Sequence, residues 1–175
     1  MQKTLNDVLS NNLPMHVRSN HALEHATLHV LQKKGLKSRL GGISDVGGFW
    51  IYGDIDAVDL MEAAQEALNR LSSGEKDLAI HPNCGTNIAV GAFAGGSLAW
   101  LSLLGTRGKP GKKLRRFPIA VLMGLVGYQL ARPYGPDLQK QITTNADVSG
   151  LEIVEVMEHE VLGYPVHRVT TRYKE

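Results

Sequence analysis

The stretch Ser19-Asn20-His21-Ala22-Leu23-Glu24-His25-Ala26-Thr27-Leu28-His29 contains the motif H-x-x-E-H, and a third histidine follows one helical turn later. Residues four apart lie on the same face of an α-helix, so His21 and His25 project together with Glu24 beside them. Two imidazoles one turn apart can bind one zinc ion, and a neighbouring glutamate can take a proton from the zinc-bound water. The stretch therefore predicts a helix that presents a metal site.

The bounds of this helix follow from the residues on either side of the motif. Ser19 or Asn20 is expected to cap it, and it should run to about Lys34 and end at Gly35. Four apolar residues at helical spacing are expected to face a core: Leu23, Ala26, Val30 and Leu31. Upstream, residues 4–13 predict a short helix that ends before Pro14.

Downstream of the motif the sequence alternates between strand and helix patterns. Glycine pairs at positions 41–42 and 47–48 punctuate two short apolar runs, which predicts a β-hairpin with residues 49–52 as its second strand. A helix is expected over residues 57–71 and a strand over residues 78–81. Near the C-terminus, residues 151–161 and 166–173 predict two further strands, with a helix as the alternative for the first.

These elements predict an α+β fold in three parts. Residues 1–82 would form a small mixed domain with the His-rich helix, a β-hairpin and a second helix. Residues 83–135 would form a glycine-rich, hydrophobic helical hairpin with a basic turn. Residues 136–175 would supply a C-terminal β-hairpin that packs on the first domain.

The hydrophobic hairpin is expected to cross a membrane. Residues 84–105 and 117–131 carry no charged side chain, and the first run is long enough to span a bilayer. Gly91 and Gly95 form a G-x-x-x-G pattern, which allows close helix contact in lipid and suggests a homo-oligomer or a partner membrane protein. The expected location is a bacterial inner membrane, with lipid as a partner. A buried hairpin in a core or an oligomer interface is the alternative.

The charge pattern leaves the orientation of this hairpin open. Six of the 19 basic residues crowd into one short stretch: Arg107, Lys109, Lys112, Lys113, Arg115 and Arg116. The positive-inside rule would place this turn in the cytoplasm, but both flanks would then need export, and no signal peptide is visible. The formal net charge is only +2, and no aromatic residue interleaves the basic cluster before Phe117, so no nucleic-acid partner is expected.

A zinc hydrolase needs a third protein ligand besides His21 and His25. Glu62 and Glu66, one turn apart on the second helix, are the first candidates, followed by His81 and then Cys84. Cys84 is the only cysteine, which excludes an intramolecular disulfide and a cysteine-rich zinc site. The alternative to a metal site is a solvated helix face that carries histidines.

Three stretches together resemble an uncharacterised family of small bacterial membrane proteins: HALEHATLH at 21–29, GGFWIYGD at 47–54 and HPNCGTN at 81–87. The resemblance covers roughly residues 18 to 105 and implies no assigned activity. A narrower resemblance, confined to His21, Glu24 and His25, is to the inverted zincin metallopeptidases. That resemblance implies histidine ligands and a glutamate base, although the third-ligand glutamate of those larger proteins lies farther downstream than Glu62 or Glu66.

The sequence thus leads to two functional hypotheses. The first is a membrane-anchored, zinc-dependent hydrolase of the peptidase class, in which Glu24 acts as the general base. The second is a non-enzymatic membrane protein that scaffolds a partner complex, with a structural metal or none. Substrate and oligomeric state are left open.

Overall fold

The computed structural model describes residues 14–35, 40–106 and 108–174. The chain divides into two compact units, one formed by Met1–His81 with Gln139–Glu175 and the other by Pro82–Leu138. The helix expected over residues 4–13 lies outside the described residues. Each unit is described by itself.

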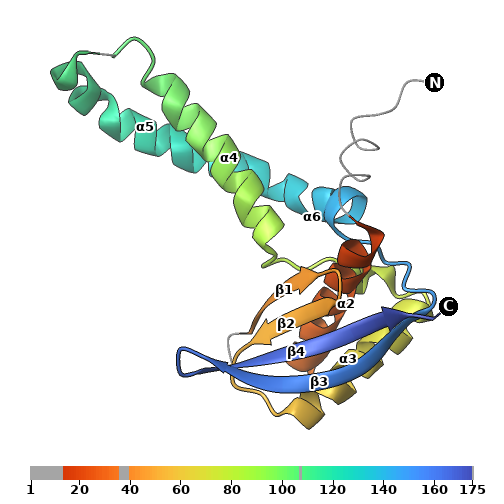
Figure 1. The fold of residues 1–175 in the computed structure, drawn as a ribbon. Coiled ribbons are helices and arrows are strands. Elements are labelled where there is room, and N and C mark those ends of the chain that lie inside the picture. Colours follow the sequence, from red (N-terminus) through yellow and green to blue (C-terminus); the bar gives the residue numbers. More distant parts are fainter. Residues whose placement is uncertain (1–13, 36–39, 107, 175) are drawn as a thin grey trace, which may run out of the picture. The chain divides into compact units, whose positions relative to one another are not determined.

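The first unit is a four-stranded antiparallel sheet with helices on one face (Figure 1). Its elements in chain order are α2 (Met15–Lys33), β1 (Gly41–Asp45), β2 (Gly48–Tyr52), α3 (Ala57–Ser72), the 3₁₀ helix η1 (Lys76–Ala79), the π-helical turn η3 (Gln139–Thr143), β3 (Leu151–Val161) and β4 (Tyr164–Tyr173). The strand order is β1-β2-β4-β3, so the two hairpins join through β2 and β4. The mixed α+β character of the chain is as expected.

Helix α2 begins earlier than the sequence indicated. It starts at Met15, so Ser19 and Asn20 lie inside the helix, where both are fully buried, and neither caps it. The Asn20 side chain donates to the Asp45 carbonyl at 2.8 Å and accepts from the Thr171 hydroxyl at 2.7 Å. The Asn20 side chain therefore joins α2 to β1 and β4 through hydrogen bonds that a capping rule does not anticipate.

The segment expected as a strand at residues 78–81 is not one. Residues Lys76–Ala79 form the 3₁₀ helix η1, in which the Leu78 N–H donates to the Glu75 carbonyl and the Ile80 N–H donates to the Asp77 carbonyl. These local bonds take up the donors that a strand would need for pairing. By contrast, α3 ends one residue beyond its expected end, and the Asp56 carboxylate caps it by accepting from the Val58 N–H.

The second unit is a helical hairpin. It contains α4 (Gly85–Ser102), α5 (Pro110–Ala131), the 3₁₀ turn η2 (Arg132–Tyr134) and the short α6 (Gly135–Leu138). Helix α5 begins at Pro110, seven residues before the apolar run, so the basic side chains 112–116 belong to its first turns and not to the connecting turn as expected. Proline at the first helical position suits this start, and Pro118 lies inside the helix.

Glycine brings the two helices of the hairpin close together. A Cβ on Gly95 would lie 2.6 Å from the Gly124 carbonyl oxygen, and one on Gly127 would lie 2.8 Å from the Ala94 carbonyl oxygen. Gly91 faces the ring of Tyr128 in the same way. The Gly91 and Gly95 pair is thus buried against α5 of the same chain.

The expected transmembrane hairpin is contradicted. Within residues 14–35, 40–106 and 108–174, no helix combines the length and the apolar character that a membrane crossing requires. The physical reason lies in composition: α4 is uncharged, but glycine, serine, threonine and asparagine take many of its positions, and the first turns of α5 are cationic. The inner-membrane location that rested on these two runs is therefore wrong.

Candidate functional site

His21, His25 and His29 form a row along one side of α2, whereas the fourth histidine of the helix, His16, stacks on Tyr173. The rings of His21 and His25 lie with their centroids 4.3 Å apart, and a pair of their nitrogens lies within 4.8 Å. His25 is buried, with 2% of its surface exposed, while His21 is partly buried. This spacing confirms that the two imidazoles point to the same place.

Backbone carbonyls fix the tautomers of both rings. The Nδ1–H of His25 donates to the Ala79 carbonyl at 2.7 Å, and the Nδ1–H of His21 donates to the Thr143 carbonyl at 2.9 Å. A carbonyl oxygen only accepts, so in each neutral ring the lone pair lies on Nε2. Metal-binding histidines are typically held in this way by a carbonyl or carboxylate on the second ring nitrogen.

Glu24 lies between the two histidines in sequence and is buried, with 4% of its surface exposed. The Ser44 hydroxyl on β1 donates to Glu24 Oε2 at 2.5 Å. Burial raises the pKa of Glu24, while the Ser44 hydrogen bond and the charge of His21 act in the opposite direction. A carboxyl group with a raised pKa is suited to accept a proton near neutral pH.

Gly42 on β1 gives Glu24 its space, and this predicts a matched pair of stability effects. A Cβ at position 42 would overlap the Glu24 carboxylate, whereas one at position 41 meets nothing within 4 Å. We expect Gly42→Ala to lower the free energy of unfolding by about 1–3 kcal/mol, since Ser44 holds the carboxylate in place. Gly41→Ala should change it by less than ~0.5 kcal/mol. Urea unfolding measures both values, and equal effects would contradict this packing.

Hydrogen bonds also join α2 to the segment that follows η1. The His29 Nε2–H donates to the Ile80 carbonyl at 2.8 Å, and the Gln32 amide donates to His81 Nε2 at 3.2 Å. The His81 ring lies 4.8 Å from that of His29 and 5.7 Å from that of His25, between ring centroids. The row of histidines therefore continues from α2 onto residue 81.

The buried side chain of Gln139 holds His81 in position. The His81 N–H donates to Gln139 Oε1 at 2.9 Å, and Gln139 Nε2 donates to the His81 carbonyl at 3.1 Å. Gln139 has no exposed surface. The Gln139 amide thus satisfies both backbone groups of His81, as a neighbouring strand does in a β-sheet, and this fixes the backbone at position 81.

His81 predicts an acid-sensitive stability. Burial lowers the pKa of His81 to about 4, with the charges of His29 and His25 acting in the same direction. Between about pH 6.5 and pH 4 the unfolded chain binds a proton that the folded chain does not. The free energy of unfolding should therefore fall as the pH falls through this window, by at most about 3 kcal/mol.

The measurement is urea unfolding in the presence of a chelator at several pH values within that window. His81→Asn should flatten the pH dependence relative to the unchanged protein, and the contribution of Glu24 cancels in this comparison. His159→Asn, at an exposed histidine of β3, is the control. A pH dependence that His81→Asn leaves intact would contradict the assignment.

The structure places the carboxylates of Glu62 and Glu66 beside Lys34 and not beside His21 and His25. Lys34 Nζ lies 3.7 Å from a carboxylate oxygen of Glu62 and 4.0 Å from one of Glu66, and Arg70 pairs with Glu66 at 3.6 Å. Lys34 follows His25 by nine residues, roughly 14 Å along a helix. Within the described ranges, these carboxylates are not grouped with the histidines at ligand distance.

Cys84 belongs to the second unit, where it precedes α4. It is buried, and its sulfur accepts from the Thr86 N–H at 3.4 Å. A sulfur acceptor of this kind caps the first turn of the helix. In sequence, only two residues separate Cys84 from His81.

Sequence reasoning did not find four residues that shape this site. Ser44 and Gly42 contact Glu24, the Thr143 carbonyl orients His21, and Gln139 holds His81. The glycine-rich strand was a signal for the first two, because glycine permits close approach. For the other two the sequence carries no local signal, since they lie more than fifty residues away from their partners.

Comparison with known proteins places the chain in a family. A family model described as "Domain of unknown function (DUF6391)" matches residues 16–156. The chain belongs to this family. An uncharacterized protein of Picosynechococcus sp. is 34% identical to it over 179 residues, which cover 91% of this chain and 80% of that protein. No solved structure matches.

The comparisons confirm an uncharacterised family and extend it beyond the stretch that carried the resemblance. They name neither a membrane association nor a peptidase. The structure adds that a divalent metal ion could be held at His21 and His25, because ligand nitrogens of both residues converge there.

Proposed function

We propose that this chain is a zinc-dependent hydrolase, with a peptide as the substrate class. One observation supports this above others: two imidazoles with fixed tautomers converge beside a buried glutamate whose pKa is raised. Neutral imidazole nitrogens are ligands that zinc prefers, so the donor set fits this ion. A bound zinc ion supplies Lewis acidity, which makes a water molecule acidic and stabilises a developing oxyanion.

In this proposal each residue has one role. His21 and His25 would hold the ion through Nε2, and the carbonyls of Thr143 and Ala79 keep the rings in the tautomer that this requires. Glu24 accepts the proton of the attacking water and returns it to the leaving amine. Ser44 positions the Glu24 carboxylate through its hydroxyl.

Strand β1 provides the support for a peptide substrate. It lies at the edge of the sheet, and its residues Gly42 and Ser44 contact Glu24. An extended peptide can add to a sheet edge through main-chain hydrogen bonds, with its scissile bond carried past the base. A peptide therefore suits the proposal better than a small ester.

A third ligand completes the proposed site. The sequence supplies His81 and Cys84, separated by two residues, as candidates. Titration of the metal-free protein with cobalt(II) distinguishes them, because a thiolate ligand adds a charge-transfer absorption in the near ultraviolet that imidazole does not. Loss of that absorption in Cys84→Ser would assign the cysteine, and its absence from the unchanged protein would favour His81.

The first experiment is metal content by mass spectrometry on protein prepared with and without added zinc. One zinc per chain, lost in His21→Ala and His25→Ala, would support the site and justify assays with quenched fluorogenic peptides. A chain that binds no zinc when it is offered would refute the hydrolase proposal.

The competing function is a non-enzymatic scaffold. His25 donates to the carbonyl of Ala79, the last residue of η1, and His29 donates to that of Ile80. These histidines therefore also have a structural use that needs no metal. A scaffold would tolerate Glu24→Gln without loss of function and would bind a partner in the absence of zinc.

A further inference from the structure

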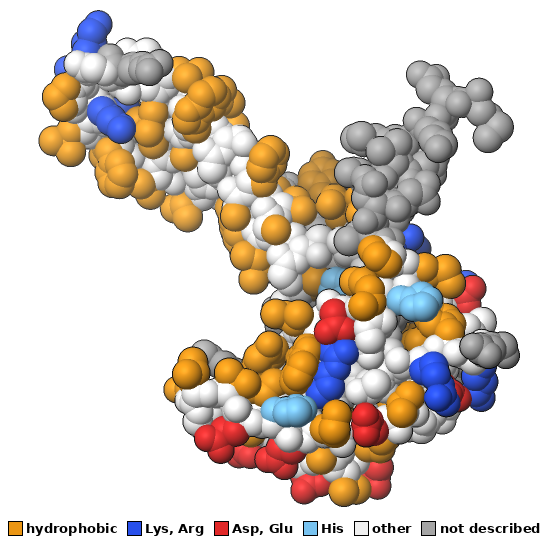
Figure 2. All heavy atoms as spheres, viewed as in Figure 1, with side chains coloured by type: hydrophobic (Ala, Val, Ile, Leu, Met, Phe, Trp, Pro, Cys, Tyr) orange, Lys and Arg blue, Asp and Glu red, His pale blue; other side chains and the backbone are white. Residues whose placement is uncertain are grey.

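The α4–α5 hairpin presents its large side chains outward. The residues buried within its two helices are small: Gly91 and Gly95 on α4, and Ala120, Gly127 and Ala131 on α5. Thirteen large apolar side chains of the hairpin expose between 39% and 79% of their surface: Ile88, Phe93, Trp100, Leu101, Leu104, Leu114, Phe117, Ile119, Val121, Leu122, Leu125, Val126 and Leu130. Figure 2 shows this apolar surface along the hairpin. The interface between the two helices therefore uses glycine and alanine, and the bulky residues are left for another contact.

The amount of exposed surface is large enough for a stable protein interface. An aromatic side chain has roughly 150–250 Å² of surface, and an aliphatic one has less. Thirteen such side chains, each about half exposed, therefore present on the order of 1,000 Å² of apolar surface per chain. A standard interface needs about 800 Å² per partner, and monomers rarely expose an apolar patch of more than a few hundred Å². The exposed apolar surface of the hairpin is therefore of the size that a protein interface buries.

Helix α5 has the residue spacing of a helix that pairs with another. Leu114, Phe117, Val121 and Leu125 recur at intervals of three and four residues, and so do Ile119, Leu122, Val126 and Leu130. At 100° per residue the two rows lie on either side of the outward direction of α5, and every member is exposed, so the outer surface of the helix is apolar over a wide arc. An exposed helix face of this kind is typical of one that packs against another helix. A second copy of the chain presents the same apolar face.

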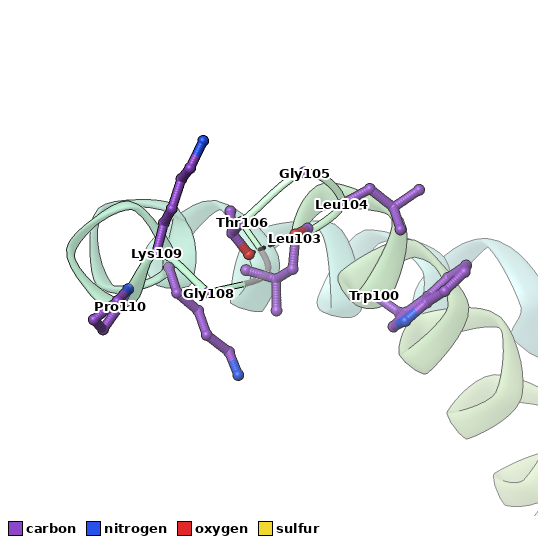
Figure 3. A pocket seen from close by; sticks show the side chains of 9 residues that line it. Trp100, Leu103, Leu104, Gly105, Thr106, Gly108, Lys109 and Pro110 are labelled. Carbon is purple, nitrogen blue, oxygen red and sulfur yellow. Dashed lines mark hydrogen bonds between the residues drawn. The ribbon is translucent and has the colours of Figure 1, made fainter.

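The charges of the hairpin favour one alignment of two copies over the other. The second unit contains seven Lys and Arg residues and a single acidic residue, Asp137. Four of these cations lie in the first turns of α5, and Lys109 directly precedes the helix. A pocket of about 720 Å³ at this end is lined by Trp100, Leu104, Lys109 and Lys113 (Figure 3). Parallel copies would bring these cations together. Antiparallel copies separate them by the length of α5, roughly 33 Å, which is several Debye lengths.

We propose that the outer face of α5 pairs with the same face of a second copy of this chain, in an antiparallel, two-fold symmetric contact. The contact is isologous, so the middle of α5, at Val121 and Leu122, lies near the symmetry axis. This interface is independent of the proposed hydrolase activity.

The test is the molar mass of the full chain by light scattering after size exclusion, over a dilution series. We expect twice the mass of one chain for the unchanged protein, and a single chain for the double variant Val121→Glu/Leu122→Glu. Val58→Glu, at a valine on α3 that is 66% exposed, is the matched control and should remain dimeric. Circular dichroism verifies that each variant is folded.

Cysteine cross-linking tests the antiparallel alignment. In a Cys84→Ser background, Val121→Cys or Leu122→Cys should form a disulfide between copies, whereas Gly111→Cys at the basic end should not. A monomer at every concentration, a dimer that the double variant leaves intact, open-ended assembly, or cross-linking at Gly111→Cys would each overturn the proposal.

Discussion

Glu24→Gln is expected to abolish most hydrolysis while leaving the bound metal in place. The amide is close in shape to the carboxyl group and can still accept the Ser44 hydrogen bond, so the buried position should remain filled. It cannot take a proton from water, and a positioned general base contributes typically about 10²–10⁴-fold to the rate. We therefore expect kcat/KM to fall by a factor in that range.

The measurement pairs cleavage of a fluorogenic peptide with metal content of the same samples. Glu62→Gln is the matched control, because Glu62 is an exposed glutamate whose carboxylate lies beside Lys34. Undiminished hydrolysis in Glu24→Gln, at full metal content, would refute the role of Glu24. Loss of metal in this variant would show that Glu24 is itself a ligand.

His25→Ala is expected to remove the metal site. Loss of a supporting group around a metal typically costs ~10–100-fold in affinity, so loss of a ligand should cost more than about 100-fold. His29→Ala is the control one turn farther along α2, since the His29 ring donates to the Ile80 carbonyl. Zinc affinity, measured by competition with a chromogenic chelator, should fall in the first variant and persist in the second.

A second substitution separates loss of the ligand from loss of the fold. His25 also donates to the Ala79 carbonyl, and its side chain is 2% exposed, so alanine leaves a cavity and an unpaired carbonyl. His25→Asn retains a donor at this position. If His25→Asn folds normally and still binds zinc as tightly as the unchanged chain, His25 is not a ligand.

The sequence was sufficient for the elements whose signals are local. The spacing of His21, Glu24 and His25 placed them on one helix face, and the apolar spacing over residues 57–71 located α3. Glycine pairs located the first β-hairpin, and the strand patterns of residues 151–161 and 166–173 located the second. In each case the interacting residues lie within a few positions of one another.

The sequence was misleading where a local pattern had more than one tertiary outcome. Residues 84–105 lack charge, which suggested a membrane span, but absence of charge is compatible with glycine-rich packing between α4 and α5. Ser19 and Asn20 looked like helix caps but bond to residues more than a hundred positions away, namely Asp147 and Thr171. A sequence does not distinguish a polar side chain that caps a helix from one that forms a hydrogen bond with a distant segment, because the residue types are the same.

The sequence by itself determined which residues share a helix face, and therefore that two imidazoles and a carboxyl group meet on α2. The tertiary structure alone decided their chemistry. The tautomers depend on carbonyls of Ala79 and Thr143, and the raised pKa of Glu24 depends on burial against β1. Helical periodicity is a property of neighbouring residues, whereas desolvation and long-range hydrogen bonds depend on segments that only folding brings together.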